Sequence, residues 1–149
     1  MKSMHNLITE FERTIQESHD QLARITEAES EPPLSPGKWS RKQVIGHLID
    51  SADNNHQRFV RLQLENSLSL LGYEQDGWVA CQDYQHRSWA DLLLLWQSYN
   101  LHLLHVVAHI PEDKLNNVGS VRGGEPVTLG FLVEDYVGHL KHHLRQILG

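Results

Sequence analysis

Four segments of the chain carry apolar residues at the three- and four-residue spacing of an amphipathic α-helix, and stretches rich in Pro or Gly separate them. The first segment keeps this spacing from Leu7 to Ile25 and should end near Glu29, ahead of the Pro32-Pro33 pair. Helices of this length are not stable alone, so they must bury their apolar stripes against one another. The sequence therefore predicts an all-α fold, a four-helix bundle with long, partly irregular connections.

Three polar residues predict where the later helices begin. Ser40 is a good N-cap, and Gln43 three residues later completes a capping box, so the second helix should start there. Ser88 and Thr128 are the corresponding caps of the third and fourth helices. These caps divide the second half of the chain into two more helical segments.

The connections between these helices show no sustained helical or strand period. The second helix should fray before Gly72, and residues 72–87 are expected to be ordered but irregular. Pro111 should end the third helix, and residues 112–127 contain several glycines. A loop of that length is unusual unless it has a function, such as covering a site. No β-rich alternation extends beyond a few residues.

Composition narrows the class of protein. A chain of 149 residues with 40% hydrophobic content can form one core, so residues 1–149 are expected to be a single domain. The net charge is −6 and the basic residues are dispersed, which argues against nucleic acid as a partner. The lone Cys81 cannot form an internal disulfide, and no apolar run approaches the ~20 residues of a membrane span. We expect a cytoplasmic protein without a membrane partner.

Histidines on two helices suggest a metal site. His139 and His143 are four residues apart on the fourth helix, so their imidazoles project from one face on successive turns. Alone, such a pair is often a coincidence of composition, but His47 lies at the edge of the apolar stripe of the second helix and could complete a set of three. The residues that could line an adjoining pocket are Ser51, Asn54, Asn55, Arg58 and Tyr136.

Other histidine, acidic and cysteine side chains are not expected to form a functional site. A second row of histidines on the third helix is interpreted as a solvated face, with a second, adventitious metal site as the alternative: His102, His105 and His109. Three acidic residues are expected mostly on outward faces, so no carboxylate general base is predicted: Asp50, Asp53 and Asp135. Cys81 has no nearby group to activate its thiol as a nucleophile.

Two longer motifs carry a family resemblance. They are Gly37-Lys38-Trp39-Ser40 leading into residues 44–51, and Thr128-Leu129-Gly130-Phe131 leading into residues 135–143. Over nearly its whole length the chain resembles the DinB-like (YfiT-like) superfamily of metalloproteins. The resemblance implies that His47, His139 and His143 bind one divalent metal. It also implies a four-helix bundle with a long, non-sequential connection and, commonly, a homodimer.

The expected ligand set shapes the predicted chemistry. Three neutral imidazoles leave at least one coordination position open, as in catalytic rather than structural metal sites. An all-nitrogen set favours Zn, Ni, Co, Cu or Fe over Mg or Ca, and we expect Zn or Ni first, with Fe, Co or Mn as alternatives. Characterised members of the family that this chain resembles include transferases and isomerases that use low-molecular-weight thiols. The resemblance therefore implies a metal-dependent transferase that activates such a thiol for attack on a small electrophile. A non-catalytic metal-binding or sensing bundle and a metal-dependent hydrolase are the alternatives.

Overall fold

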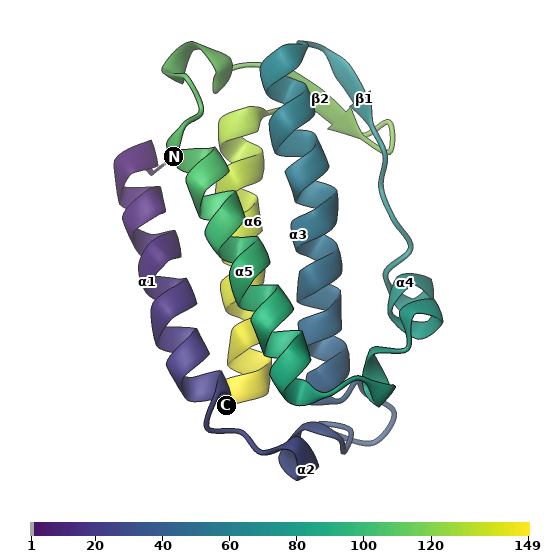
Figure 1. The fold of residues 1–149 in the computed structure, drawn as a ribbon. Coiled ribbons are helices and arrows are strands. Elements are labelled where there is room, and N and C mark those ends of the chain that lie inside the picture. Colours follow the sequence, from purple (N-terminus) through teal and green to yellow (C-terminus); the bar gives the residue numbers. More distant parts are fainter. Residues whose placement is uncertain (1) are drawn as a thin grey trace.

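The computed structural model describes residues 2–149; Met1, the first residue of the predicted domain 1–149, lies outside the described residues. Four long helices dominate it: α1 (Met4–Leu22), α3 (Arg41–Leu64), α5 (Trp89–Ala108) and α6 (Leu129–Leu148) (Figure 1). The predicted all-α four-helix bundle is confirmed. The short elements are α2 (Glu27–Ser30), α4 (Gln75–Gln82), the 3₁₀ turns η1 (Tyr84–His86) and η2 (Glu112–Lys114), and the strands β1 (Leu68–Leu70), β2 (Val118–Val121) and β3 (Val127–Thr128).

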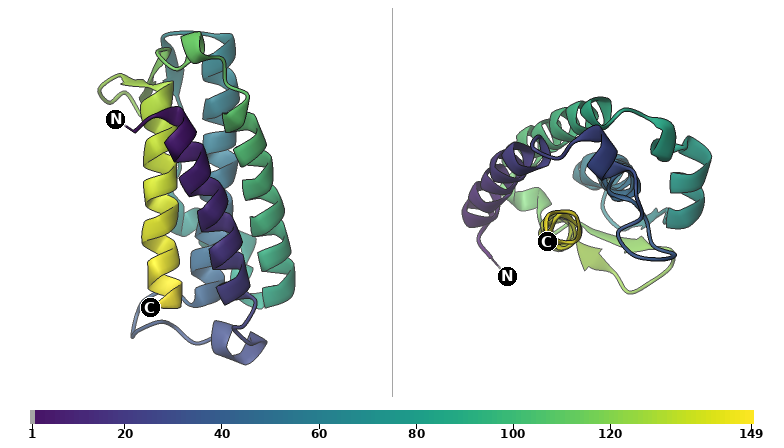
Figure 2. Two further views of the ribbon diagram at one scale, coloured as in Figure 1. Left: turned by 90° about the vertical axis from the view of Figure 1, so that its left-hand side faces the viewer. Right: turned by 90° about the horizontal axis from the view of Figure 1, so that it is seen from below.

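The order of the helices in space explains the long connections. Helices α1 and α6 run in one direction and α3 and α5 in the other, as Figure 1 shows. Both α1 and α3 pack against α5 and α6, so α1 and α3 occupy opposite corners of the bundle (Figure 2). Because α3 and α5 are parallel neighbours, the chain that leaves the end of α3 must return along its whole length before α5 can begin.

Side-chain caps define three of the helix starts as predicted. The Ser40 hydroxyl accepts a hydrogen bond from the Gln43 amide at 3.2 Å, and the Gln43 side chain accepts one from the Ser40 amide at 2.9 Å. The hydroxyls of Ser88 and Thr128 accept hydrogen bonds from the Asp91 and Phe131 amides and so cap α5 and α6. Each cap satisfies an amide that would otherwise lack an intrahelical partner.

The first helix is shorter than predicted. It ends at Leu22 rather than near Glu29, and residues 27–30 form the separate helix α2. Thr26 adopts an extended conformation and forms a capping box with Glu29, so it starts a new helix instead of continuing the old one. The prediction followed the apolar spacing and overlooked this second cap.

Both connections predicted to lack regular structure contain some. Residues 72–87 include α4 and η1, and residues 112–127 include η2, β2 and the start of β3. Strand β1 pairs in parallel with β2, with Leu68 opposite Gly119, and β2 pairs antiparallel with β3. These strands are too short to produce a sequence pattern, and the first two belong to different connections. Their sheet ties the two connections together at one end of the bundle (Figure 1).

The core lies along the axis of the bundle. Phe11, Phe59 and Trp96 are fully buried there, one from each of α1, α3 and α5. One polar pair lies among them: the Tyr136 hydroxyl donates to Oδ1 of the fully buried Asn100 at 2.6 Å. Within residues 2–149, no helix is both long and apolar enough to cross a membrane.

Candidate metal centre

Three histidines converge between α3 and α6. His47 lies in the second turn of α3, and His139 and His143 lie one turn apart on α6. Nε2 of His139 lies 3.2 Å from Nε2 of His47 and 3.1 Å from Nε2 of His143. Among residues 2–149 these three form the one group of at least three His, Cys, Asp or Glu residues whose potential ligand atoms all lie within 4.8 Å of one another.

This spacing fits a transition-metal ion. Imidazoles bound to zinc at about 2.0–2.1 Å in tetrahedral arrangement separate their nitrogens by about 3.3–3.4 Å, close to the two distances found here. Three neutral nitrogens this close repel one another unless a proton or a cation lies between them. The donor set therefore suits a divalent cation of the type that prefers nitrogen ligands.

Burial keeps the histidines neutral. His47 is fully buried, and burial is the main cause that lowers its pKa to about 3, with smaller contributions from His139 and His143. Burial also lowers the pKa of His139 to about 4. Protons therefore do not compete for these nitrogens near neutral pH.

Two neighbouring side chains hold the imidazoles in place. The Nδ1–H of His143 donates to Oε1 of Gln146 at 2.7 Å, a pairing that leaves the lone pair of this histidine on Nε2. The indole ring of Trp39 lies against the imidazole of His47, with ring centroids 5.2 Å apart. Gln146 and Trp39 thus fix the orientation of one ligand each. Neither was predicted as a site residue, although Gln146 follows His143 by three residues on the same helical face.

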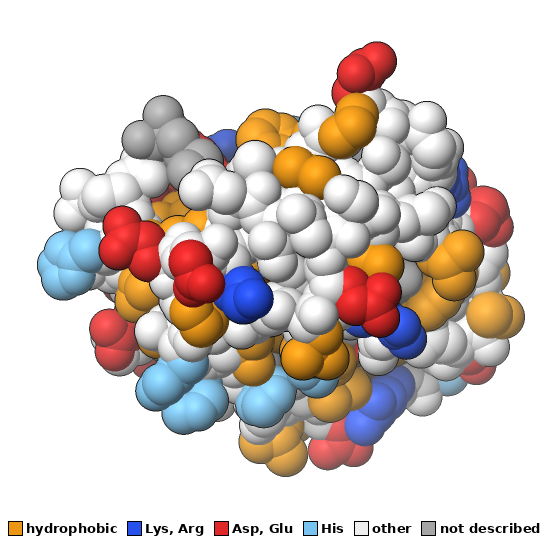
Figure 3. Space-filling view, turned by 90° about the horizontal axis from the view of Figure 1, so that it is seen from above, with side chains coloured by type: hydrophobic (Ala, Val, Ile, Leu, Met, Phe, Trp, Pro, Cys, Tyr) orange, Lys and Arg blue, Asp and Glu red, His pale blue; other side chains and the backbone are white. Residues whose placement is uncertain are grey.

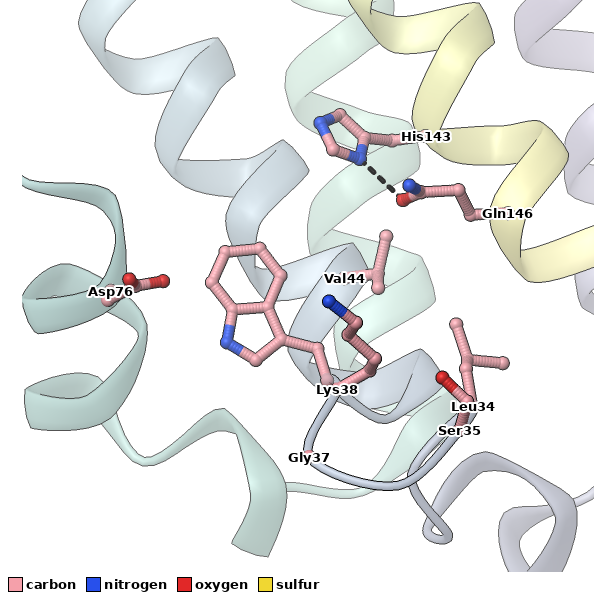
Figure 4. Close-up of a pocket in the computed structure, with 9 residues that line it drawn as sticks. Leu34, Ser35, Gly37, Lys38, Val44, Asp76, His143 and Gln146 are labelled. Atoms are coloured by element: carbon pink, nitrogen blue, oxygen red, sulfur yellow. Dashed lines mark hydrogen bonds between the residues drawn. The ribbon is translucent and has the colours of Figure 1, made fainter.

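Two cavities adjoin the triad from different sides. The larger, of about 650 Å³, reaches His143 and Gln146 and has Lys38 and Asp76 in its wall (Figure 4). The smaller, of about 280 Å³, reaches His139. Gln75 borders the smaller cavity and Asp76 the larger, so the start of α4 borders both. Each cavity touches a different histidine of the triad.

The predicted pocket residues divide into three groups. Ser51, Asn55 and Arg58 line the smaller cavity, in a row along α3 beyond His47. Tyr136 also borders this cavity, but its side chain is buried and its hydroxyl donates to Asn100. Asn54 is not among the lining residues, and its amide donates back to the Asp50 carbonyl at 2.9 Å. Sequence reasoning missed Tyr73 and Arg122, which come from the two connections.

The expectation that Asp50 faces outward is wrong. Its carboxylate is buried and accepts hydrogen bonds from the Tyr84 hydroxyl at 2.6 Å and from the Gln82 amide at 2.8 Å. Burial raises the pKa of Asp50. The prediction considered only the faces of α3 that meet other bundle helices, whereas α4 and η1 cover a third face. Asp50 anchors that covering segment.

The histidine row on α5 is exposed, as expected. His102, His105 and His109 are all solvent-accessible, and Nδ1 of His109 bonds to the His105 carbonyl at 2.7 Å. Figure 3, which views the molecule from above, shows histidine side chains gathered at the surface along one edge. Over residues 2–149 this row does not bring three ligand atoms together.

Comparison with known proteins agrees with this architecture. The model of the DinB superfamily matches residues 10–147. A protein of Bacillus mycoides strain KBAB4, provisionally named a metal-dependent hydrolase, is 23% identical over 95% of this chain and 83% of its own length. YfiT of Bacillus subtilis, which carries the same provisional name, is 24% identical over 83% of this chain and 70% of its own length.

Two solved structures share the fold. The structure of Bacillus subtilis YfiT, described as a probable metal-dependent hydrolase with an unusual four-helix bundle topology, superposes with a TM-score of 0.86 at 22% identity, over 97% of this chain and 83% of YfiT. A mycothiol-dependent maleylpyruvate isomerase superposes with a TM-score of 0.82 at 14% identity. That match covers 98% of this chain but 61% of the isomerase. At these identities the likeness concerns the fold.

Proposed function

Because this chain belongs to the DinB superfamily, we propose that it is a divalent-metal-dependent S-transferase that joins a low-molecular-weight thiol to a small electrophile. The observation that carries the proposal is the pair of cavities at the histidine triad. A transferase must bring two organic reactants to one reactive centre, whereas a hydrolase needs one organic reactant and water. Two separate cavities, each bordered by a different histidine, suit the first requirement.

The triad would hold the metal. His47, His139 and His143 supply three neutral nitrogens, and Zn or Ni suits them best, with Fe, Co or Mn as alternatives. When bound, the cation supplies Lewis acidity that lowers the pKa of a thiol at the open coordination position. Gln146 keeps the lone pair of His143 directed at the centre, and Trp39 packs against His47.

Because the cavities differ in size and lining, we assign one reactant to each. The larger cavity has room for a low-molecular-weight thiol, and Lys38 and Asp76 offer it one charge of each sign (Figure 4). The smaller cavity would take the electrophile. In the reaction the sulfur forms a bond to carbon, the leaving group departs with its bonding electron pair, and the thiol proton passes to solvent.

Thiol-dependent turnover tests this function. Zinc-loaded protein should conjugate cysteine or coenzyme A to a bromobimane reporter faster than the uncatalysed reaction, and His139→Ala should abolish the difference while the helical circular dichroism remains. His142→Ala is the matched control, because this neighbouring histidine is exposed and lies outside the triad. Equal thiol-dependent rates in His139→Ala and wild type would reject the proposal.

Hydrolysis is the second candidate, because two relatives carry that provisional name. Ester and amide substrates tested without any thiol separate the two reactions. Turnover that needs water alone and is lost in His139→Ala would favour the hydrolase, whereas stoichiometric metal without turnover of either kind would favour a metal-binding or sensing module.

We also propose a homodimer, as the family resemblance implies. Light scattering after size-exclusion chromatography should give about twice the 17.2 kDa mass of the chain. A mass equal to one chain across the micromolar range would exclude the dimer.

A further inference from the structure

Two arginines from distant parts of the chain line the smaller cavity. Arg58 lies on α3, eleven residues and about three turns after His47. Arg122 follows β2 directly, in the turn that leads to β3. The same cavity reaches His139, so both guanidinium groups share a space with one member of the triad.

The fold positions both side chains. Nη2 of Arg58 donates to the Leu71 carbonyl at 3.0 Å, while its Nε is buried without a hydrogen-bond partner among residues 2–149. Arg122 lies across Gly72, since a Cβ added at residue 72 would be 1.9 Å from Nε of Arg122. The segment that follows β1 therefore contacts both arginines. Its Leu71 carbonyl accepts the hydrogen bond from Arg58, and the missing side chain of Gly72 leaves room for Arg122.

The charge of these arginines is not balanced inside the cavity. Neither forms an ion pair within 4.0 Å in the described part of the chain. Asp135 is the single carboxylate among the lining residues, so two guanidinium groups and one carboxylate leave a net charge of +1. The chain as a whole carries −6. A local positive charge within an acidic protein attracts an anion.

We infer that the smaller cavity binds the carboxylate of an acidic electrophile, with Arg58 and Arg122 as its counter-charges. This inference rests on the proposed function, because it specifies the substrate whose electrophilic carbon faces the triad. The planar fork of N–H donors on a guanidinium matches a carboxylate. Ser51 and Asn55 border the same cavity and supply neutral polar groups. A volume of about 280 Å³ limits the substrate to a small organic acid.

Matched pairs of acids and amides test the inference without turnover. Propionate, fumarate and benzoate, each beside its amide, are titrated into metal-free and zinc-loaded protein and followed by calorimetry. At least one acid should bind about ten-fold more tightly than its amide, the size of effect expected for a charge-assisted pair. Metal-free protein removes any direct bond between a carboxylate and the metal.

Variants locate the binding site. Arg122→Gln and Arg58→Gln should each reduce the preference for the acid by about ten-fold, without changing the zinc content. Arg61→Gln is the matched control, since it removes the same charge from the same helix at an exposed position that does not border the cavity. If Arg58→Gln fails to fold, Arg122→Gln still decides, because Arg122 is exposed.

The outcomes separate this inference from the proposed function. Equal binding of all three acids and their amides, or an acid preference that survives Arg122→Gln, would overturn the inference even if thiol-dependent turnover is found. An acid preference that is lost in Arg122→Gln and kept in Arg61→Gln supports the anion site even if no thiol is ever a substrate.

Discussion

Nδ1 of His143 lies 2.7 Å from Oε1 of Gln146, one helical turn further along α6. This contact gives the half-buried imidazole of His143 one defined donor and leaves its other nitrogen free to bind a metal. We predict that Gln146→Ala lowers zinc affinity by roughly ten-fold, as losses of such supporting contacts do in other metal sites. Competition with a chromophoric chelator measures the change. The exposed neighbour Arg145→Ala serves as the control, and equal affinities in the two variants would contradict the orienting role.

Gly46 and Gly138 should respond in opposite ways to alanine. A Cβ at Gly46 would lie 2.1 Å from the Tyr84 ring, so Gly46→Ala should destabilise the protein by about 1–3 kcal/mol. Nothing lies within 4 Å of a Cβ at Gly138, so Gly138→Ala should stabilise it by about 0.5–1 kcal/mol through the better helix propensity of alanine. Urea denaturation measures both, and a stabilising Gly46→Ala would show that η1 does not pack as described.

Tyr136→Phe tests the buried polar pair. Removing the hydroxyl leaves Oδ1 of Asn100 buried without its donor, which should cost about 1–3 kcal/mol of unfolding free energy. Because this hydroxyl points to Asn100 and not to the triad, the two sites share no partner, and zinc affinity should stay within about a factor of two of wild type. A large loss of metal affinity with unchanged stability would instead assign Tyr136 to the site.

Metal-free protein should become less stable in mild acid. In the unfolded chain His47 and His139 have ordinary pKa values of 6.5, and in the folded protein these pKa values are about 3 and about 4. As pH falls from 6.5 towards 4, the unfolded chain binds protons that the folded protein does not. The free energy of unfolding should therefore fall by up to about 1.4 kcal/mol per pH unit for each histidine.

Urea denaturation of chelator-treated protein at several pH values between 7.5 and 5 measures this slope. His47→Gln removes one of the titrating groups, so its stability should depend less on pH than that of wild type. An identical slope in the two proteins would mean that His47 does not resist protonation in the folded state.

Local signals explain what the sequence could predict. The capping residues Ser40, Ser88 and Thr128 act on amides within three residues, so their effect is visible in the sequence. The spacing of His139 and His143 likewise follows from one helix. Helix geometry offered His47 only as a possible third ligand, because 92 residues separate it from His139 and nothing local brings their helices together. The family resemblance implied that it completes the set.

Contacts between distant segments explain what could not be predicted. Leu68 pairs with Gly119 only because two connections meet at one end of the bundle, and neither strand is long enough to show a period. Asp50 is buried because α4 and η1 cover a face of α3 that carries no apolar stripe. Arg122 borders the smaller cavity because it directly follows β2, and the pairing of β2 with β1 brings this part of the chain next to α3.

The metal content of untagged protein is the most direct test of the histidine triad. Mass spectrometry of wild type should find close to one equivalent of Zn, Ni or another divalent transition metal per chain, unchanged in His142→Ala and strongly reduced in His139→Ala. Wild-type protein that is metal-free as purified and fails to take up added Zn or Ni would contradict the account.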